Sequence, residues 1–268
     1  MQEQCFVPLY ILSFVERNPP KSSGAFSISP FAILESKNVL SESPYMKPSN
    51  FLYSCPLCTE PNTIVLGEAH RRLYISCSNC QLIFVPPPYH LTPQQEKAHY
   101  DQHHNDPEDE AYRKFLQQVM GPLHARLVPR SSGLDFGAGP GPTLSCMLQE
   151  VGHTVSIYDP YYAQDLAVLN QKYDFITATE VAEHLHQPGL VLNQLWAMLH
   201  GDGLLALMTQ LTPDNQPFFE WYYLRDPTHV CFFSASTWSW LSDRWSAEIA
   251  YWEKNVIIFA KPSHTTPA

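Results

Sequence analysis

The stretch Leu134–Gly141 reads LDFGAGPG in one-letter code. Its apolar start predicts a buried strand, and the glycines at 137, 139 and 141 predict a sharp turn where that strand ends. Apolar residues then recur with helical spacing over residues 144–151. The turn therefore opens a helix, whose free N–H groups favour a ligand bound beside the turn.

The chemistry of that ligand is predicted from two departures from the dinucleotide-binding fingerprint. The fingerprint places its third glycine where this chain has Pro142, and here a glycine stands at 141 instead. Asp135, inside the strand, would repel a pyrophosphate. Both departures favour a cationic ligand that carries no phosphate.

Strands and helices alternate downstream of the turn. Strand-like segments cover residues 154–158, 175–178 and 203–208, and a helical face covers 192–199. This alternation predicts an α/β fold with a mostly parallel, Rossmann-like sheet and helices on both faces. Residues 247–251 and 256–259 predict a C-terminal antiparallel hairpin.

The order of these motifs resembles that of class I S-adenosylmethionine-dependent methyltransferases. The glycine turn is followed by Asp159 at the end of the next strand, by the YDFI segment 173–176 leading into EVAEH at 180–184, and by LHGDGLL at 199–205. The resemblance covers about residues 131–262. It implies a transferase that moves a methyl group from S-adenosyl-L-methionine to an acceptor. A cytoplasmic location is expected from the cysteines, whose pattern fits metal binding and reduced thiols better than disulfides.

The resemblance also implies roles for individual residues. Asp159 would accept hydrogen bonds from both ribose hydroxyls, and Glu180 would border the methyl-transfer pocket. The methionine end and sulfonium side of the cofactor would lie against Asp135, Gly137, Ala138, Gly139 and Gly141. Two simpler interpretations stay open: Asp159 caps a turn with Pro160, and Asp135 is a structural carboxylate.

The group Glu180, Glu183 and His184 has two interpretations. It is similar to the Glu-x-x-Glu-His pattern of ubiquinone-pathway O-methyltransferases, which is associated with a divalent metal. In many relatives the same spacing begins a helix, and the side chains make only local hydrogen bonds. We predict Glu180 and His184 as catalytic residues and leave the metal open.

The acceptor segment, residues 221–234, is expected to form a loop beyond the predicted strand at 203–208, and it reads WYYLRDPTHVCFFS. Its aromatic side chains suit a flat or amphiphilic acceptor. His229 is the candidate general base because imidazole takes up a proton near neutral pH. The alternative is a buried histidine bonded to Asp226. A second polar cluster, at 100–106, is interpreted as a lid or as a capped helix break.

Two Cys-x-x-Cys pairs, Cys55 with Cys58 and Cys77 with Cys80, are separated by eighteen residues. This spacing predicts a zinc ribbon. Four thiolates would fill the coordination sphere, so the Zn²⁺ would be structural. The alternative is four thiols without metal. Short strands are expected at 51–53, 63–66, 73–76 and 82–85, and two helical pieces within 93–128, broken near Pro107.

Composition and charge limit the partners. The chain has 268 residues and a formal charge of −10, and residues 131–268 carry five Lys or Arg against fourteen Asp or Glu. Such a field disfavours nucleic acid, although Arg71 and Arg72 in the ribbon keep RNA open. No apolar run is long enough for a membrane anchor, and no signal peptide is recognised. Met46 is expected to be the natural start.

The predicted organisation is a Pro- and Ser-rich extension (1–50), a zinc ribbon (51–90), a helical linker or lid (91–130), a methyltransferase domain (131–262) and a tail (263–268). The predicted function is methyl transfer (EC 2.1.1.-) to a small molecule, sugar-like or quinone- or phenol-like. The alternatives are an RNA base methyltransferase whose ribbon binds RNA and a non-catalytic S-adenosylmethionine-binding or interaction protein. The sequence leaves the oligomeric state open.

Overall fold

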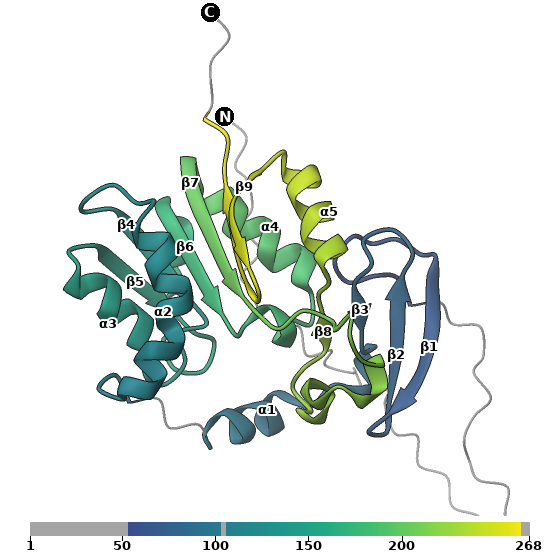
Figure 1. Cartoon of the computed structure of the whole chain (residues 1–268). Coiled ribbons are helices and arrows are strands. Elements are labelled where there is room, and N and C mark those ends of the chain that lie inside the picture. Colours follow the sequence, from purple (N-terminus) through teal and green to yellow (C-terminus); the bar gives the residue numbers. More distant parts are fainter. Residues whose placement is uncertain (1–52, 103–105, 264–268) are drawn as a thin grey trace, which may run out of the picture. The chain divides into compact units, whose positions relative to one another are not determined.

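The computed structural model describes residues 53–102 and 106–263, shown in Figure 1. The predicted extension 1–50, most of the first predicted strand and nearly all of the predicted tail lie outside the described residues. The chain divides into two units, and every described residue belongs to the second, Leu52–Ala268.

The larger sheet has six strands in the order β5-β4-β6-β7-β10-β9. Its strands are β4 (Ser132–Phe136), β5 (Thr154–Tyr158), β6 (Tyr173–Thr179), β7 (Leu199–Met208), β9 (Glu248–Glu253) and β10 (Val256–Ala260). The first four pair in parallel, and β10 is antiparallel to both β7 and β9. The predicted mostly parallel sheet and C-terminal hairpin are confirmed.

Helices cover both faces of this sheet, as predicted (Figure 1). They are α2 (Glu110–His124), α3 (Thr143–Glu150), α4 (Pro188–Met198) and α5 (Ala235–Trp245). Side chains of α2 and α3 pack into one cluster with Ile258 of β10. The next residue, Phe259, points to the opposite face, where it meets Trp238 and Trp245 of α5.

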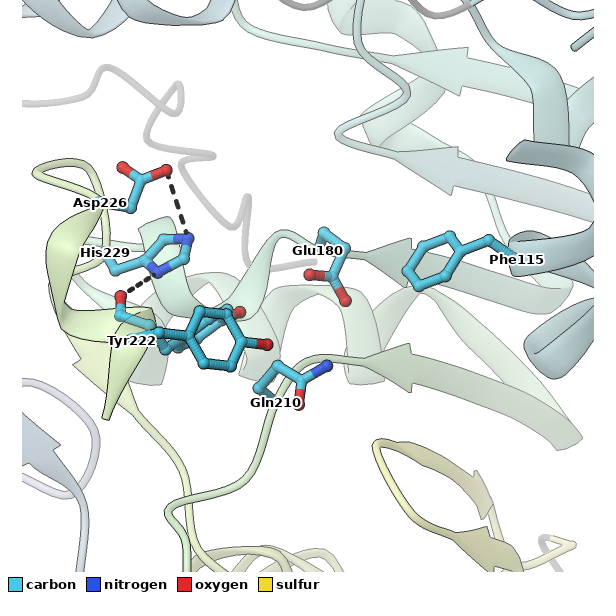
Figure 2. Close-up of a pocket in the computed structure, with 7 residues that line it drawn as sticks. Phe115, Glu180, Gln210, Tyr222, Asp226 and His229 are labelled. Atoms are coloured by element: carbon cyan, nitrogen blue, oxygen red, sulfur yellow. Dashed lines mark hydrogen bonds and ion pairs between the residues drawn. The ribbon is translucent and has the colours of Figure 1, made fainter. Parts of the chain in front are cut away.

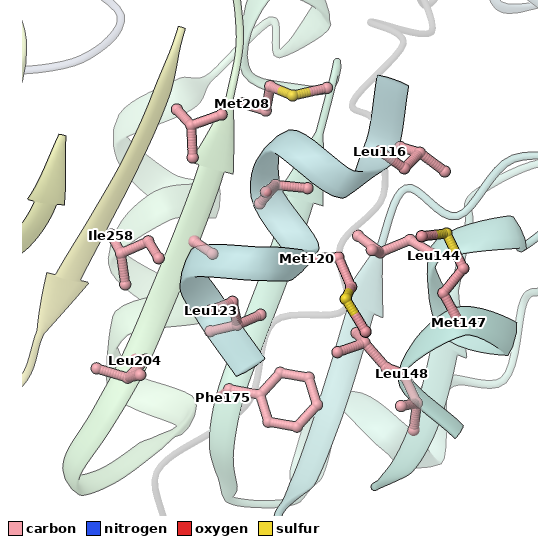
Figure 3. Close-up of a cluster of buried hydrophobic side chains, with 14 residues drawn as sticks. Leu116, Met120, Leu123, Leu144, Met147, Leu148, Phe175, Leu204, Met208 and Ile258 are labelled. Carbon is pink, nitrogen blue, oxygen red and sulfur yellow. The ribbon is translucent and has the colours of Figure 1, made fainter. Parts of the chain in front are cut away.

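The core lies between α2, α3 and the sheet (Figure 3). Helix α2 contributes residues that recur every three or four positions, which places them on one side of the helix: Leu116, Val119, Met120 and Leu123. They pack against Phe175 at the centre of β6, which is completely buried. Burial of this apolar stripe fixes α2 against the sheet.

The smaller sheet has four strands, in the order β1-β2-β3-β8. They are β1 (Thr63–Ala69), β2 (Arg72–Cys77), β3 (Ile83–Phe84) and β8 (Cys231–Phe232). The fourth strand belongs to the acceptor segment, for which the sequence predicted a loop. That part of the prediction is wrong because a strand of two residues shows no alternation to detect.

Two helices, α1 (Pro93–Tyr100) and α2, occupy the segment predicted as two helical pieces. Helix α1 begins at a capping box formed by Thr92 and Gln95. The Asp109 carboxylate accepts hydrogen bonds from two N–H groups at the start of α2. The remaining helical turns are η1 (Pro87–Tyr89), η2 (Leu166–Asn170), η3 (Ala182–His184), η4 (Phe218–Glu220) and η5 (Tyr222–Arg225).

Within 53–102 and 106–263, no helix combines the length and apolar character needed to cross a bilayer.

We expect Gly133→Ala to destabilise the fold by about 2 kcal/mol, because overpacking a filled core forces its neighbours to move. A Cβ at Gly133 in β4 would lie 2.1 Å from Cζ of Phe175. Urea unfolding measures the loss. The control is Gly121→Ala inside α2, where the Cβ meets only the end of the flexible Gln117 side chain at 3.2 Å. The control should be neutral or stabilised by up to about 1 kcal/mol, and equal stability of the two variants would contradict the prediction.

Candidate functional site

The glycine turn joins β4 to α3 at the carboxyl edge of the sheet. Gly137 and Gly139 have φ of 76° and 66°, the left-handed region that favours glycine. The N–H groups of Gly137 and Ala138 both donate to the carbonyl of Tyr158, at 2.7 and 3.3 Å. A Cβ at Gly137 would lie 2.4 Å from Cγ2 of Val181, so the turn sits directly against the segment after β6. Gly141 does not share the positive φ, and its carbonyl accepts a hydrogen bond from N–H of Thr143.

Asp135 lies beneath this turn and is 4% exposed. Its carboxylate accepts hydrogen bonds from the hydroxyls of Ser145 on α3, at 2.9 Å, and Thr177 on β6, at 2.7 Å. Burial raises its pKa, while the two hydroxyls oppose that shift. Asp135 therefore ties β4, which leads into the turn, to α3 and β6.

Asp159 follows β5 directly and faces the same turn. Its carboxylate accepts hydrogen bonds from the N–H groups of Gly139 (3.0 Å), Tyr161 (2.8 Å) and Tyr162 (3.0 Å). The residue caps its own turn, as one interpretation of the sequence expected, and it also holds the glycine turn in place. A carboxylate has room for about four hydrogen bonds, so one acceptor position remains for a ligand hydroxyl, whereas the resemblance implies hydrogen bonds from both ribose hydroxyls.

Glu180 directly follows β6 and has a φ of 53°, which is unusual for a residue with a Cβ. Its Oε1 is buried and has no hydrogen-bond partner among the described residues, and the same holds for Oε2 of Glu183. Burial, followed by the neighbouring Glu183 carboxylate, raises the pKa of Glu180 to about 9. Glu180 is therefore protonated at neutral pH, while the completely buried Glu183 accepts a hydrogen bond from the Tyr223 hydroxyl.

A pocket of about 400 Å³ connects Glu180 with the acceptor segment. Figure 2 shows Glu180 and Phe115 on one side of it and Tyr222, His229 and Asp226 on the other. Gln210, from the stretch after β7, and Tyr223 complete the lining. The structure thus brings Glu180 and His229, which the sequence placed in separate parts of the site, to one cavity.

His229 is 7% exposed, and both ring nitrogens have neighbours. Nδ1 lies 2.9 Å from the Tyr223 carbonyl, and Nε2 lies 3.8 Å from a carboxylate oxygen of Asp226. Burial, followed by the nearby His184 ring, lowers the pKa of His229 to about 4. The imidazole is therefore neutral at pH 7, the form that can accept a proton.

A metal-capable group also forms here, with a membership that differs from the predicted one. Glu183, His184 and His229 offer ligand atoms that all lie within 4.8 Å of one another, whereas Glu180 is not part of the group. Nδ1 of His184 lies 3.2 Å from the Thr228 carbonyl. Protein groups already contact each of the three side chains.

The four predicted cysteine ligands lie together in the ribbon. Sγ of Cys55 is 3.5 Å from Sγ of Cys80, Cys58 and Cys77 are 3.4 Å apart, and all four sulfurs lie within 4.8 Å of one another. A tetrahedral zinc–thiolate site with Zn–S bonds of about 2.3 Å has sulfur–sulfur edges of about 3.8 Å. The Cys80 thiol, by hydrogen bonding, lowers the pKa of Cys55 to about 6. The cysteine positions therefore fit a zinc ion.

The sequence did not predict the contacts of two buried charged residues near the site, Arg72 and Glu96. Arg72 of β2, interpreted from the sequence only as positive charge, is buried beneath the acceptor segment, whereas Arg71 is exposed. Glu96 of α1 is also buried and binds the Tyr161 hydroxyl at 2.9 Å and Nε2 of His186 at 2.7 Å. Alternation along β2 places residue 72 inward, but the sequence does not show what covers that face.

Among curated proteins, no sequence matches this chain. Several solved structures are similar to this chain, among them the following two. The 1,6-didemethyltoxoflavin-N1-methyltransferase of Burkholderia thailandensis, solved with 1,6-didemethyltoxoflavin and S-adenosylhomocysteine, is 16% identical; the match covers 70% of this chain and 98% of that one, with a TM-score of 0.45. The magnesium protoporphyrin IX methyltransferase of Synechocystis, solved with S-adenosylhomocysteine, is also 16% identical; the match covers 63% and 93% of the two chains, with a TM-score of 0.42.

The family model described as a methyltransferase domain matches residues 102–245. This range contains the glycine turn, Asp159 and all seven residues that line the pocket. Because the match covers more than half of the 268 residues, the chain belongs to the methyltransferase-domain family.

Proposed function

We propose that the protein is an S-adenosyl-L-methionine-dependent methyltransferase (EC 2.1.1.-) whose acceptor is a small, flat molecule with a hydroxyl group. The observation that carries this proposal is the pocket that joins Glu180, beside the glycine turn, to Tyr222 and His229 of the acceptor segment. A volume of about 400 Å³ is within the range of small-molecule sites.

The residues at the sheet edge suit this cofactor. Asp159 keeps one acceptor position for a ribose hydroxyl. The glycine turn exposes its backbone, and we propose that the cofactor contacts Gly137, Ala138, Gly139 and Gly141. Asp135 would hold the strand before this turn in place through its hydrogen bonds to Ser145 and Thr177. The cofactor, when bound, supplies an electrophilic methyl group on a positively charged sulfur. Glu180 offers a buried oxygen without a partner toward such a charge.

On the acceptor side of the pocket, some side chains bind the acceptor and others remove its proton. Phe115 and Tyr222 offer aromatic faces that hold a flat acceptor and exclude water. The neutral His229 ring takes the proton of the acceptor hydroxyl, and Asp226 lies beside it to balance the resulting charge. Positioning and proton removal are what the chain itself supplies.

RNA is the weaker of the candidate acceptors. Of the two adjacent arginines in the ribbon, Arg72 is buried, so only Arg71 of that pair faces solvent. Residues 131–268 carry a strong negative charge, which repels a phosphate backbone. The charge distribution therefore favours a small-molecule acceptor.

We expect Asp159→Asn to weaken binding of S-adenosylmethionine by about tenfold or more, because the variant loses charge-assisted hydrogen bonds. Isothermal titration measures the affinity. Asp165→Asn is the matched control, since Asp165 also accepts a backbone N–H, at 2.9 Å from Ala167, and lies on the same connection. Equal affinities of wild type and Asp159→Asn would remove the ribose assignment.

The same protein preparations test the transfer itself. Each protein is incubated with a cell extract and S-adenosylmethionine labelled in its methyl group. The label transferred to small molecules is then compared with the label transferred to RNA. His229→Gln should keep the cofactor affinity of wild type and slow the labelling. Label appearing only in RNA would contradict the proposed acceptor class.

We expect binding of S-adenosylmethionine at pH 7 to release up to about one proton from Glu180. The raised pKa keeps this carboxyl neutral without ligand, and a cation beside it lowers that pKa. S-adenosylhomocysteine, whose sulfur is neutral, should release none. Calorimetric titrations in phosphate and in Tris buffer measure the released protons, and Glu180→Gln should abolish the difference between the two ligands. Equal proton release by both ligands in wild type would contradict the placement of Glu180.

We also propose that Cys55, Cys58, Cys77 and Cys80 hold one structural Zn²⁺. Metal analysis of freshly purified, reduced protein should find one zinc per chain, and Cys77→Ser should lose it together with thermal stability, because the small ribbon has little core of its own. Cys146→Ser is the control, since Cys146 lies on α3 outside the group. Wild-type protein without zinc would disprove the ribbon site.

A further inference from the structure

Arg72 is buried against the backbone of the acceptor segment, with 6% of its surface exposed. Its guanidinium donates hydrogen bonds to four carbonyls of that segment: Leu224, Asp226 at 3.1 Å, Pro227 at 3.2 Å and His229 at 2.8 Å. A single side chain of the ribbon therefore fixes the path of six consecutive residues, 224–229.

A lysine at position 72 could not make the same four hydrogen bonds. The guanidinium is a planar fork with five donors, whereas a lysine ammonium has three donors on a flexible stem. Among the ion pairs of the described residues, none includes Arg72. Its buried charge is thus compensated mainly by backbone carbonyls, which suits a structural clamp.

The positions of the pocket side chains follow from this clamp. His229 is held through its own carbonyl by Arg72 and through Nδ1 by the carbonyl of Tyr223. Tyr223 directly precedes Leu224, whose carbonyl also accepts a hydrogen bond from Arg72. The Tyr223 hydroxyl donates a hydrogen bond to the Glu183 carboxylate. Displacement of the segment would therefore move both His229 and Tyr223 in the pocket.

The ribbon reaches the same segment by a second route. Strand β3 pairs with β8, where Phe84 faces Cys231, and the N–H of Val85 donates to the carbonyl of Val230 at 2.9 Å. Strand β2 begins at Arg72 and ends at Cys77, one of the proposed zinc ligands. The clamp and the metal knuckle thus share one strand.

We propose that Arg72 is the positioning residue of the acceptor subsite and that the ribbon serves as an internal brace for the acceptor segment. This inference rests on the proposed function for its meaning in catalysis. The order imposed on the segment is a property of the protein without ligand and can be tested separately.

The experiment compares wild type, Arg72→Ala, Arg72→Lys and the matched control Arg71→Ala as full chains. Hydrogen–deuterium exchange follows the amides of 221–233 and those of β4 and β6. Proton NMR at a fixed pH of 7 follows the signals of the His229 ring, and isothermal titration gives the affinity for S-adenosylhomocysteine.

In Arg72→Ala, we expect at least tenfold faster exchange in 221–233, no change in β4 and β6, and a cofactor affinity within twofold of wild type. The ring signals of His229 should shift in this variant, because the ring loses its fixed contact with the Tyr223 carbonyl. Arg72→Lys should lie between wild type and Arg72→Ala, and Arg71→Ala should match wild type.

Unchanged exchange in 221–233 for both Arg72 variants would overturn the proposal. So would global unfolding of both variants, since Arg72 would then be a core residue and not a positioning one. Failure of wild type to bind S-adenosylhomocysteine would instead overturn the proposed function and leave the exchange result standing.

Discussion

The close approach of the Gly137 backbone to Val181 is the constraint on which the site depends. A side chain at this glycine would collide with Val181 and separate the end of β4 from the segment after β6. With glycine there, the carboxyl ends of the parallel strands meet, and Asp159 bonds back to the turn at Gly139. Open α/β sheets bind ligands at this edge because the loops after neighbouring strands converge there.

Burial gives the charged residues of the pocket unusual protonation states. Burial, followed by the nearby Glu183 carboxylate, raises the pKa of Glu180 so that it keeps its proton. Burial, followed by the neighbouring His184 imidazole, lowers the pKa of His229 so that its ring stays neutral. Of the pocket's ionisable side chains, Glu180 and His229 are therefore neutral at neutral pH, whereas Asp226, whose pKa is lowered to about 2, keeps its negative charge. Such a site suits an acceptor without charge and responds strongly to a cation.

The segment predicted as a zinc ribbon, residues 51–90, packs through its described residues against the part of the chain that matches the methyltransferase-domain family. Its sheet is completed by β8, and Tyr74 packs its ring against Phe218 and Phe232, which flank or belong to the acceptor segment. The knuckle carbonyl of Pro56 accepts the N–H of Gly189 at the start of α4. A module that contacts the rest of the protein in this way stabilises it and leaves little of its inner face for another partner.

Local sequence determined the elements and their order. The glycine turn, the alternation of strands and helices and the doubled cysteine spacing depend on residues close together in the chain, and their structures follow from backbone geometry and periodicity. The parallel sheet, the hairpin of β9 and β10 and the gathering of the four cysteines were predictable for this reason.

Tertiary structure alone decided which distant side chains meet. The burial of Arg72, the pairing of β3 with β8 and the joining of Glu180 to His229 connect segments separated by about 50 to 160 residues along the chain. The same is true of the protonation of Glu180, whose pKa depends on burial in a pocket built from four segments. Periodicity reports which face of an element is apolar, but it carries no information on the partner that covers that face.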